Sequence, residues 1–156
     1  DFESAGLHSF TQYWGLQIEN VYATSGLIIQ IFVHGDSLRN HLVAIVVPDP
    51  ETFVPWANAL TGQNVSLGDE KGLESLTKND HVKRAFLEEM NKVGKHAKLN
   101  GFELVKAIHL THIPFSIDND LLTPTLKVKR HAAKEYFREE IDKLYTEDNN
   151  KFASKL

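Results

Sequence analysis

Three cationic side chains, Lys127, Lys129 and Arg130, fall within four residues in the stretch LLTPTLKVKR (121–130). They stand where a long amphipathic helix is predicted to begin. A helix N-terminus already carries partial positive charge, so cations there are mildly unfavourable unless an anion binds beside them. The cluster therefore indicates either an anion-binding site or a solvated turn, and the residue types alone do not choose between the two.

Alternation along this motif predicts which side chains share a direction. If the segment is extended, Thr125, Lys127 and Lys129 point to one side, whereas Leu126 and Val128 point to the other. Both ammonium groups would then reach the same space. The helix that follows has its basic residues early and most of its acidic residues later. That order opposes the helix macrodipole and favours an anionic ligand at the N-terminal end.

The composition restricts the class of protein and of site. A chain of 156 residues is expected to form one domain with a core of its own. A net charge of −4 gives no electrostatic footprint for general nucleic-acid binding, and the lack of cysteine excludes disulfides and thiolate-ligated metals. No metal site is predicted, because His109 and His112 would lie on opposite faces of a strand. The apolar runs are too short to cross a bilayer.

The elements that must position the motif follow from periodicity and turn signals. Strands are expected over 27–36 and 41–50, and the short segment between them allows a hairpin. A third strand is expected over 102–113. Together with helices, these predict the α+β class, with a small sheet of about three strands covered by helices.

The helices are predicted from apolar residues at helical spacing and from capping residues. The expected helical segments are 18–25, 50–60, 72–79, a helix capped by Asn79 or Asp80 and stopped at Asn100-Gly101, and a single final helix bearing Ala133, Phe137, Ile141 and Leu144.

Several ordered segments resemble one protein family. LLTPTLKVKRHAAKEYFREEIDKLY (121–145) closely resembles the C-terminal motif of long-chain fatty acid–CoA ligases, members of the adenylate-forming (AMP-binding) superfamily. IENVY, IFVHGDSL and LVAIVVPDPE resemble the same family's C-terminal domain, in the same order. The resemblance covers residues 18–146 and implies the C-terminal lid domain of such a ligase. Residues 1–17 are then a divergent, poorly specified segment, and residues 147–156 a polar tail.

The resemblance implies a two-step reaction for the complete enzyme. A fatty acid and Mg-ATP form an acyl-adenylate and pyrophosphate, and CoA then displaces AMP to give acyl-CoA. ATP, Mg²⁺ and CoA serve the complete enzyme, and none is expected to be bound by this fragment alone. The implied partner is a large N-terminal adenylation domain, which carries the ATP and fatty-acid sites. Family members also associate peripherally with membranes, so the full-length protein is expected on the cytoplasmic face of the endoplasmic reticulum or another organelle.

The resemblance also assigns roles within the motif. The superfamily's adenylation lysine lies four residues after the motif threonine, which makes Lys129 the catalytic lysine if Thr125 is that threonine. Lys127 is the alternative, because it would point to the same side. Thr125, Lys127 and Arg130 are implied anion- or nucleotide-binding residues, and Arg130 alternatively anchors the helix. The isolated fragment is expected to be inactive, and the alternative function is a non-catalytic interaction or regulatory module.

The chain departs from the family pattern before Ile18. Family members carry there a hinge segment rich in Gly, Lys and Glu, followed by a loop, whereas SFTQYWGLQ (9–17) matches neither. The chain also begins with Asp1 rather than Met, so a fragment is expected. The hinge residue is therefore not carried over to this sequence.

Overall fold

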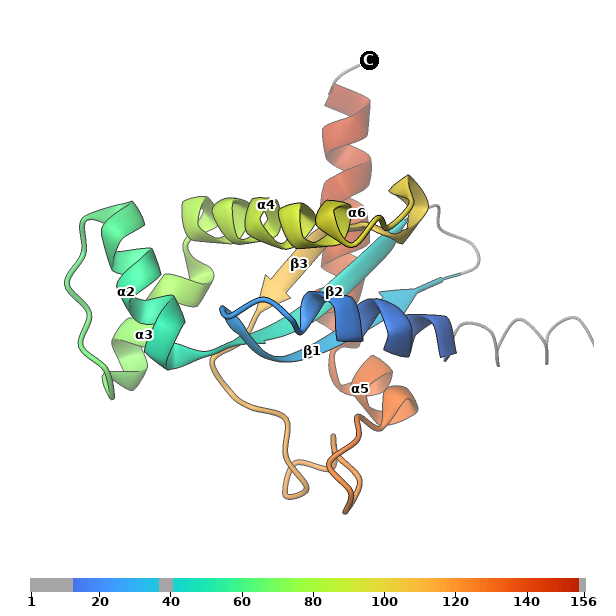
Figure 1. Cartoon of the computed structure of the whole chain (residues 1–156), viewed down its shortest axis with the longest axis horizontal. Helices are drawn as coiled ribbons and strands as arrows, with labels where there is room; N and C mark the ends of the chain where they lie inside the picture. Colours follow the sequence, from blue (N-terminus) through green and yellow to red (C-terminus); the bar gives the residue numbers. More distant parts are fainter. Residues whose placement is uncertain (1–12, 37–40, 155–156) are drawn as a thin grey trace, which may run out of the picture.

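The computed structural model describes residues 13–36 and 41–154 (Figure 1). It contains a three-stranded sheet in the order β1-β2-β3. β1 (Ile28–Gly35) and β2 (Leu42–Pro48) pair antiparallel, and β3 (Val105–Leu110) runs parallel to β2. The predicted hairpin and the predicted third strand are both confirmed.

Helices cover both faces of this sheet, which confirms the predicted α+β class. Figure 1 shows the N-terminal helix and α4 in front of the strands, with α6 behind them. No helix in the described ranges is both long enough and apolar enough to cross a membrane. The helical segments are residues 13–22, α2 (Pro50–Thr61), α3 (Glu70–Lys78), α4 (Asp80–His96), the 3₁₀ helix η1 (Gly101–Glu103), α5 (Arg130–Tyr136) and α6 (Arg138–Ser154).

The core has two layers, one on each face of β2. Ala44 and Val46 pack into the cluster formed with the N-terminal helix, α2, α3 and α4. Val43, Ile45 and Val47 pack into the cluster formed with α5 and α6. Successive side chains of a strand point to opposite faces, so a central strand covered on both faces is apolar throughout.

Helix α4 begins as predicted and ends earlier than predicted. The Asn79 side chain caps it by accepting a hydrogen bond from the backbone N of Val82 at 3.1 Å. The expected stop at Asn100-Gly101 is wrong, because the helix ends at His96 and Lys98 adopts a left-handed φ of 65°. Asn100 is instead the N-cap residue of η1.

The single helix predicted after the motif is two helices. Its apolar face is confirmed, since all four predicted positions are buried in the second core layer. However, Phe137 has φ −101° and ψ 20°, and it separates α5 from α6. The bend coincides with the Phe137 ring packing against Phe115, with ring centroids 5.8 Å apart. The helical period of the sequence therefore continues through a position where the helix itself is interrupted.

The chain is already helical at residue 13, ahead of the start expected at Ile18. Trp14 secures this early part: its indole Nε1 donates to Glu103 Oε2 at 2.8 Å, and its ring lies 5.8 Å from that of Phe102. Long-range contacts thus specify a stretch that lacks a clear period of its own. The remainder of the segment predicted as poorly specified, residues 1–12, lies outside the described residues.

Candidate functional site at the lysine hairpin

Residues 121–129, here called the lysine hairpin, fold back on themselves immediately before α5. Leu122 and Val128 form an isolated antiparallel bridge. At the tip, the backbone N of Leu126 donates to the carbonyl of Thr123 at 2.8 Å, and Leu126 has a left-handed φ of 64°. The expectation of a continuously extended motif is therefore wrong, because a tight turn reverses the chain within it.

Two threonines shape this turn. The hydroxyl of Thr123 lies 3.0 Å from that of Thr125, and it also accepts a hydrogen bond from the backbone N of Lys127 at 3.1 Å. The backbone N of Thr123 in turn donates to the carbonyl of Lys127 at 2.8 Å. The Thr125 hydroxyl is thus part of the hairpin's own hydrogen-bond network, on an exposed residue.

Lys129 lies where the second arm of the hairpin passes into α5. Its backbone N donates to the carbonyl of Leu121, and its carbonyl accepts from the backbone N of Ala133, both at 2.8 Å. Lys129 occupies the N-cap position of α5. Its ammonium lies 2.5 Å from Oδ1 of Asp120, and its side chain is 40% exposed. The backbone is therefore fixed while the charged end remains open to solvent.

Lys127 has a different environment, although it lies only two residues away. It is exposed beside the tip, and among the described residues no ion pair involves its ammonium. The structure thus brings both predicted lysines into one hairpin, but it gives only Lys129 a charged partner.

Arg130, the first residue of α5, turns away from the hairpin surface toward the interior. Its Nη1 and Nη2 donate to Oε2 and Oε1 of Glu19 at 3.0 and 2.5 Å. Glu19 Oε2 also accepts from the backbone N of Val33 at 2.7 Å. The guanidinium carbon lies 5.8 Å from the ring centroid of Phe32, in a cation–π contact. Of the two alternatives for Arg130, anion binding and anchoring of the helix, these contacts fit the anchoring role.

The Glu19 carboxylate is buried, with 5% of the residue exposed. Burial raises the pKa of Glu19 above its ordinary value, and the Arg130 guanidinium and the N–H of Val33 partly oppose that shift. Sequence reasoning missed this residue. Its signal was a charged side chain between Ile18 and Tyr22, on a helix face that is otherwise apolar.

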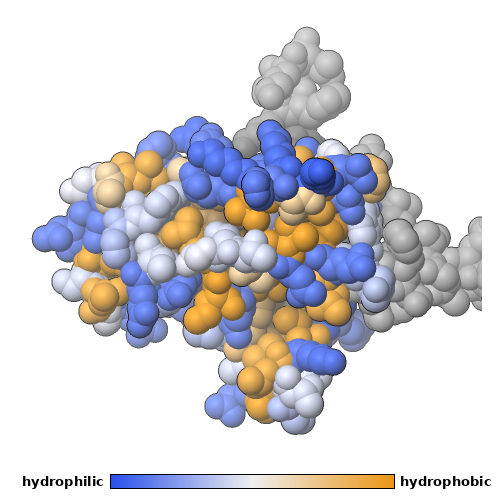
Figure 2. Space-filling model, viewed as in Figure 1, coloured by the Kyte–Doolittle hydropathy of each residue, from blue (hydrophilic) through white to orange (hydrophobic). Residues whose placement is uncertain are grey.

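The surface around the hairpin is partly apolar. Figure 2 shows orange side chains on the lower lobe, which Figure 1 assigns to the segment between β3 and α5. Ile113 and Ile117 are each 51% exposed, and Leu126 at the tip is 67% exposed. Apolar groups gathered beside charged ones are typical of a surface that meets another protein surface.

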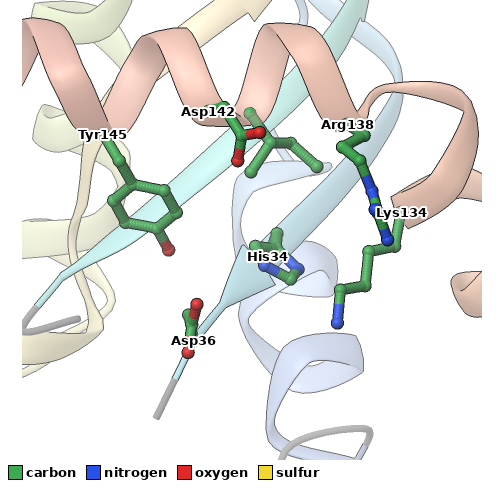
Figure 3. Close-up of a pocket in the computed structure, with 7 residues that line it drawn as sticks. His34, Asp36, Lys134, Arg138, Asp142 and Tyr145 are labelled. Carbon is green, nitrogen blue, oxygen red and sulfur yellow. The ribbon is translucent and has the colours of Figure 1, made fainter. Parts of the chain in front are cut away.

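A separate hollow of about 230 Å³ lies between the end of β1 and the helices α5 and α6 (Figure 3). Burial lowers the pKa of His34, with Lys134 acting in the same direction and Asp36 and Asp142 opposing it. The lining combines two cationic and two acidic side chains, so it presents no excess of either charge. It is lined by His34, Asp36, Lys134, Arg138, Ile141, Asp142 and Tyr145.

Neither region provides a metal centre. In the part of the chain that the structure describes, no three His, Cys, Asp or Glu side chains are grouped to hold a metal ion.

The chain is similar to known proteins over most of its length. No family model matches the chain. Human long-chain-fatty-acid–CoA ligase 1 is 48% identical over 130 residues, and human long-chain-fatty-acid–CoA ligase 6 is 47% identical over 130 residues. The peroxisomal long chain acyl-CoA synthetase 6 of Arabidopsis thaliana is 45% identical over 131 residues. These alignments cover 83–84% of this chain but only 18% of each relative.

Solved structures agree. The adenylation domain of a carboxylate reductase from Mycobacterium chelonae superposes with a TM-score of 0.67 at 28% identity, covering 84% of this chain and 17% of that one. An adenylation–carrier didomain of a carboxylic acid reductase from Segniliparus rugosus, in complex with AMP, gives 0.67 at 28% identity, covering 88% and 16%. The fold is thus that of the small α+β domain of adenylate-forming enzymes, and the chain belongs to the long-chain fatty acid–CoA ligase family.

Proposed function

We propose that this chain is the C-terminal lid of an ATP-dependent long-chain fatty acid–CoA ligase and that Lys129 supplies the ammonium group for adenylation. The observation that carries the proposal is the position of Lys129 at the N-cap of α5. The hairpin and the helix fix its backbone at N and O, and its ammonium is paired with Asp120 while it remains accessible. A group that acts in a transition state must be held in position by its surroundings.

The chemistry of adenylation calls for such a cation. A fatty-acid carboxylate oxygen bonds to the α-phosphorus of ATP while the bond from that phosphorus to the pyrophosphate oxygen breaks. Two negatively charged groups must approach each other, and an ammonium placed between them stabilises the transition state. An ammonium has three donors, so Lys129 can keep its contact with Asp120 and still donate to a carboxylate and a phosphate oxygen.

The neighbouring residues take supporting roles in this proposal. Arg130 anchors α5 through Glu19, and Thr125 shapes the turn through Thr123. Lys127, at the exposed tip, offers a second cation to the phosphates. Mg²⁺ would enter with ATP.

The partner in this proposal is a large N-terminal adenylation domain that binds ATP and the fatty acid. The length of the relatives supports it, since this chain spans 18% of each. The partly apolar lobe around Ile113, Ile117 and Leu126 would face that domain when the lid closes. The chain alone would then form no acyl-CoA. Peripheral attachment to the cytoplasmic face of the endoplasmic reticulum or another organelle would belong to the complete protein.

A chimera tests the proposal. Residues 13–156 would be joined to the N-terminal domain and hinge of a related ligase, starting at residue 13 because Trp14 packs on η1. Pyrophosphate exchange with oleate and ATP isolates the adenylation step. Lys129→Ala should lower its rate by about 10²–10³-fold, whereas the matched Lys127→Ala should cost less than roughly tenfold.

Two outcomes would contradict this assignment. A larger loss with Lys127→Ala would transfer the catalytic role to Lys127. A chimera that folds but catalyses no pyrophosphate exchange would favour the alternative function, a non-catalytic interaction or regulatory module.

A further inference from the structure

Glu19 is the one charged residue that is buried in the ranges the structure describes. Removing a carboxylate from water is costly unless it is paired and hydrogen-bonded. Here both oxygens are satisfied, by the two terminal nitrogens of Arg130 and by the backbone N of Val33. The ion pair joins three elements: the N-terminal helix, the edge strand β1 and the first residue of α5.

From this arrangement we infer that Glu19 is a positioning residue for Lys129, acting through Arg130. Arg130 follows Lys129 directly, so fixing its guanidinium against β1 and the N-terminal helix fixes the start of α5. Gly15 allows this close approach, because a Cβ at that position would lie only 3.1 Å from Nη1 of Arg130. The inference rests on the proposed function, since it gives Glu19 a role in the same step as Lys129.

The start of α5 needs this outside support. The helix has only seven residues, and no side chain caps its N-terminus. Short helices are marginal by themselves, and cations at an N-terminus make them less stable. Glu19 supplies the negative charge that Arg130 requires, and Asp120 supplies that for Lys129. The cluster of cations predicted anions at this end of the helix, and Glu19 and Asp120 of the chain itself are two of them.

The step affected should be adenylation alone. In the proposed function Lys129 acts when the carboxylate and ATP react, before CoA takes part. Loosening the start of α5 should therefore slow the first half-reaction and leave the second unchanged. A loss of folding, by contrast, would lower both.

The experiment compares Glu19→Gln with the matched control Glu88→Gln, an exposed position on α4, in the chimera. We expect Glu19→Gln to lower the rate of pyrophosphate exchange by about tenfold or more, with KM for ATP changed by less than about twofold. CoA acylation from supplied oleoyl-adenylate should change by less than about twofold. Glu88→Gln should behave like the unmutated chimera in both assays.

A second readout uses the 156-residue chain itself. Amide hydrogen exchange at Lys129 and Ala133 should accelerate in Glu19→Gln, whereas exchange at Phe86 in the other core layer should not change. Equal losses in both half-reactions, or unchanged exchange at Lys129, would overturn the inference. Suppose that Lys129→Ala leaves the rate of pyrophosphate exchange unchanged, while amide hydrogen exchange at Lys129 still accelerates in Glu19→Gln. The proposed function then fails, but the structural link from Glu19 to Lys129 stands.

Discussion

The lysine hairpin and the N-terminal helix differ in how far their roles are visible in the sequence. The hairpin shows its chemistry directly, because its cations are adjacent in the chain. The sequence of the N-terminal helix has no clear helical period before Ile18. This helix nevertheless provides the Glu19 carboxylate, which pairs with Arg130 from 111 residues away. A local cluster can therefore be recognised by residue type, whereas its support is recognisable only after the chain has folded.

The strongest test of this comparison removes the cation from the buried pair. Arg130→Met should destabilise the chain by about 3–5 kcal/mol, because Glu19 is left buried and unpaired. The free energy of unfolding from urea titrations would measure it. The double variant with Glu19→Gln should recover a large part of the loss. If the double variant is no more stable than Arg130→Met, the unpaired charge is not the cause.

The same variant should have a characteristic pH dependence. The folded-state pKa of Glu19 already lies above its ordinary value of 4.5, and loss of Arg130 raises it further. The folded state then binds the proton more tightly than the unfolded state. The penalty is absent below about pH 4.5 and grows as pH rises through the folded pKa. Urea titrations at several pH values should therefore show Arg130→Met approaching the parent at low pH, and the double variant should lose this trend.

A smaller effect is expected at the beginning of the N-terminal helix. Trp14→Phe keeps most of the apolar ring but removes the hydrogen bond to Glu103, which should cost about 1 kcal/mol. That bond is the main reason that the pKa of Glu103 is lowered. Its contribution is present above the ordinary pKa and is lost as pH falls through the lowered one. Equal destabilisation at neutral and strongly acidic pH would contradict this explanation.

Gly15→Ala separates stability from catalysis. Alanine in the helix should add up to about 1 kcal/mol of helix propensity, while its methyl group displaces the Arg130 guanidinium. We expect unchanged or slightly raised stability together with roughly threefold slower adenylation in the chimera. Gly26→Ala is the matched control, since a Cβ there meets nothing within 4 Å. Identical adenylation rates for the two variants would show that the close approach of Gly15 has no catalytic consequence.

The smallest effect is expected at Asp120→Asn. The pair with Lys129 is exposed, and Asn tolerates the left-handed φ of 63° at this position. The free energy of unfolding should change by less than about 1 kcal/mol, and any difference should vanish at high salt. A larger, salt-independent loss would mean that this contact supports the hairpin as strongly as the buried pair does.

Periodicity and capping signals predicted much of the fold. The β-rich apolar runs predicted the β1–β2 hairpin, and Asn79 or Asp80 marked the start of α4, because these features depend on neighbours in sequence. The left-handed Leu126 and the break at Phe137 were not predictable in this way. Both occur at residue types that ordinarily continue a regular element. Hydrogen bonds within the hairpin form the turn at the exposed Leu126, whereas Phe137 is buried against Phe115. For the site, the cations were visible, but their partners Glu19 and Asp120 were not.

The hydrogen bond from Val33 to Glu19 has a further consequence for the sheet. β1 is an edge strand, and unpaired N–H groups on an edge invite a strand from another molecule. The Glu19 carboxylate accepts a hydrogen bond from one of these N–H groups, that of Val33 in the C-terminal half of β1. Glu19, which we infer to position Lys129, thus also blocks part of the edge at which a strand of another molecule could pair. A chain that loses this carboxylate is expected to aggregate more readily in solution.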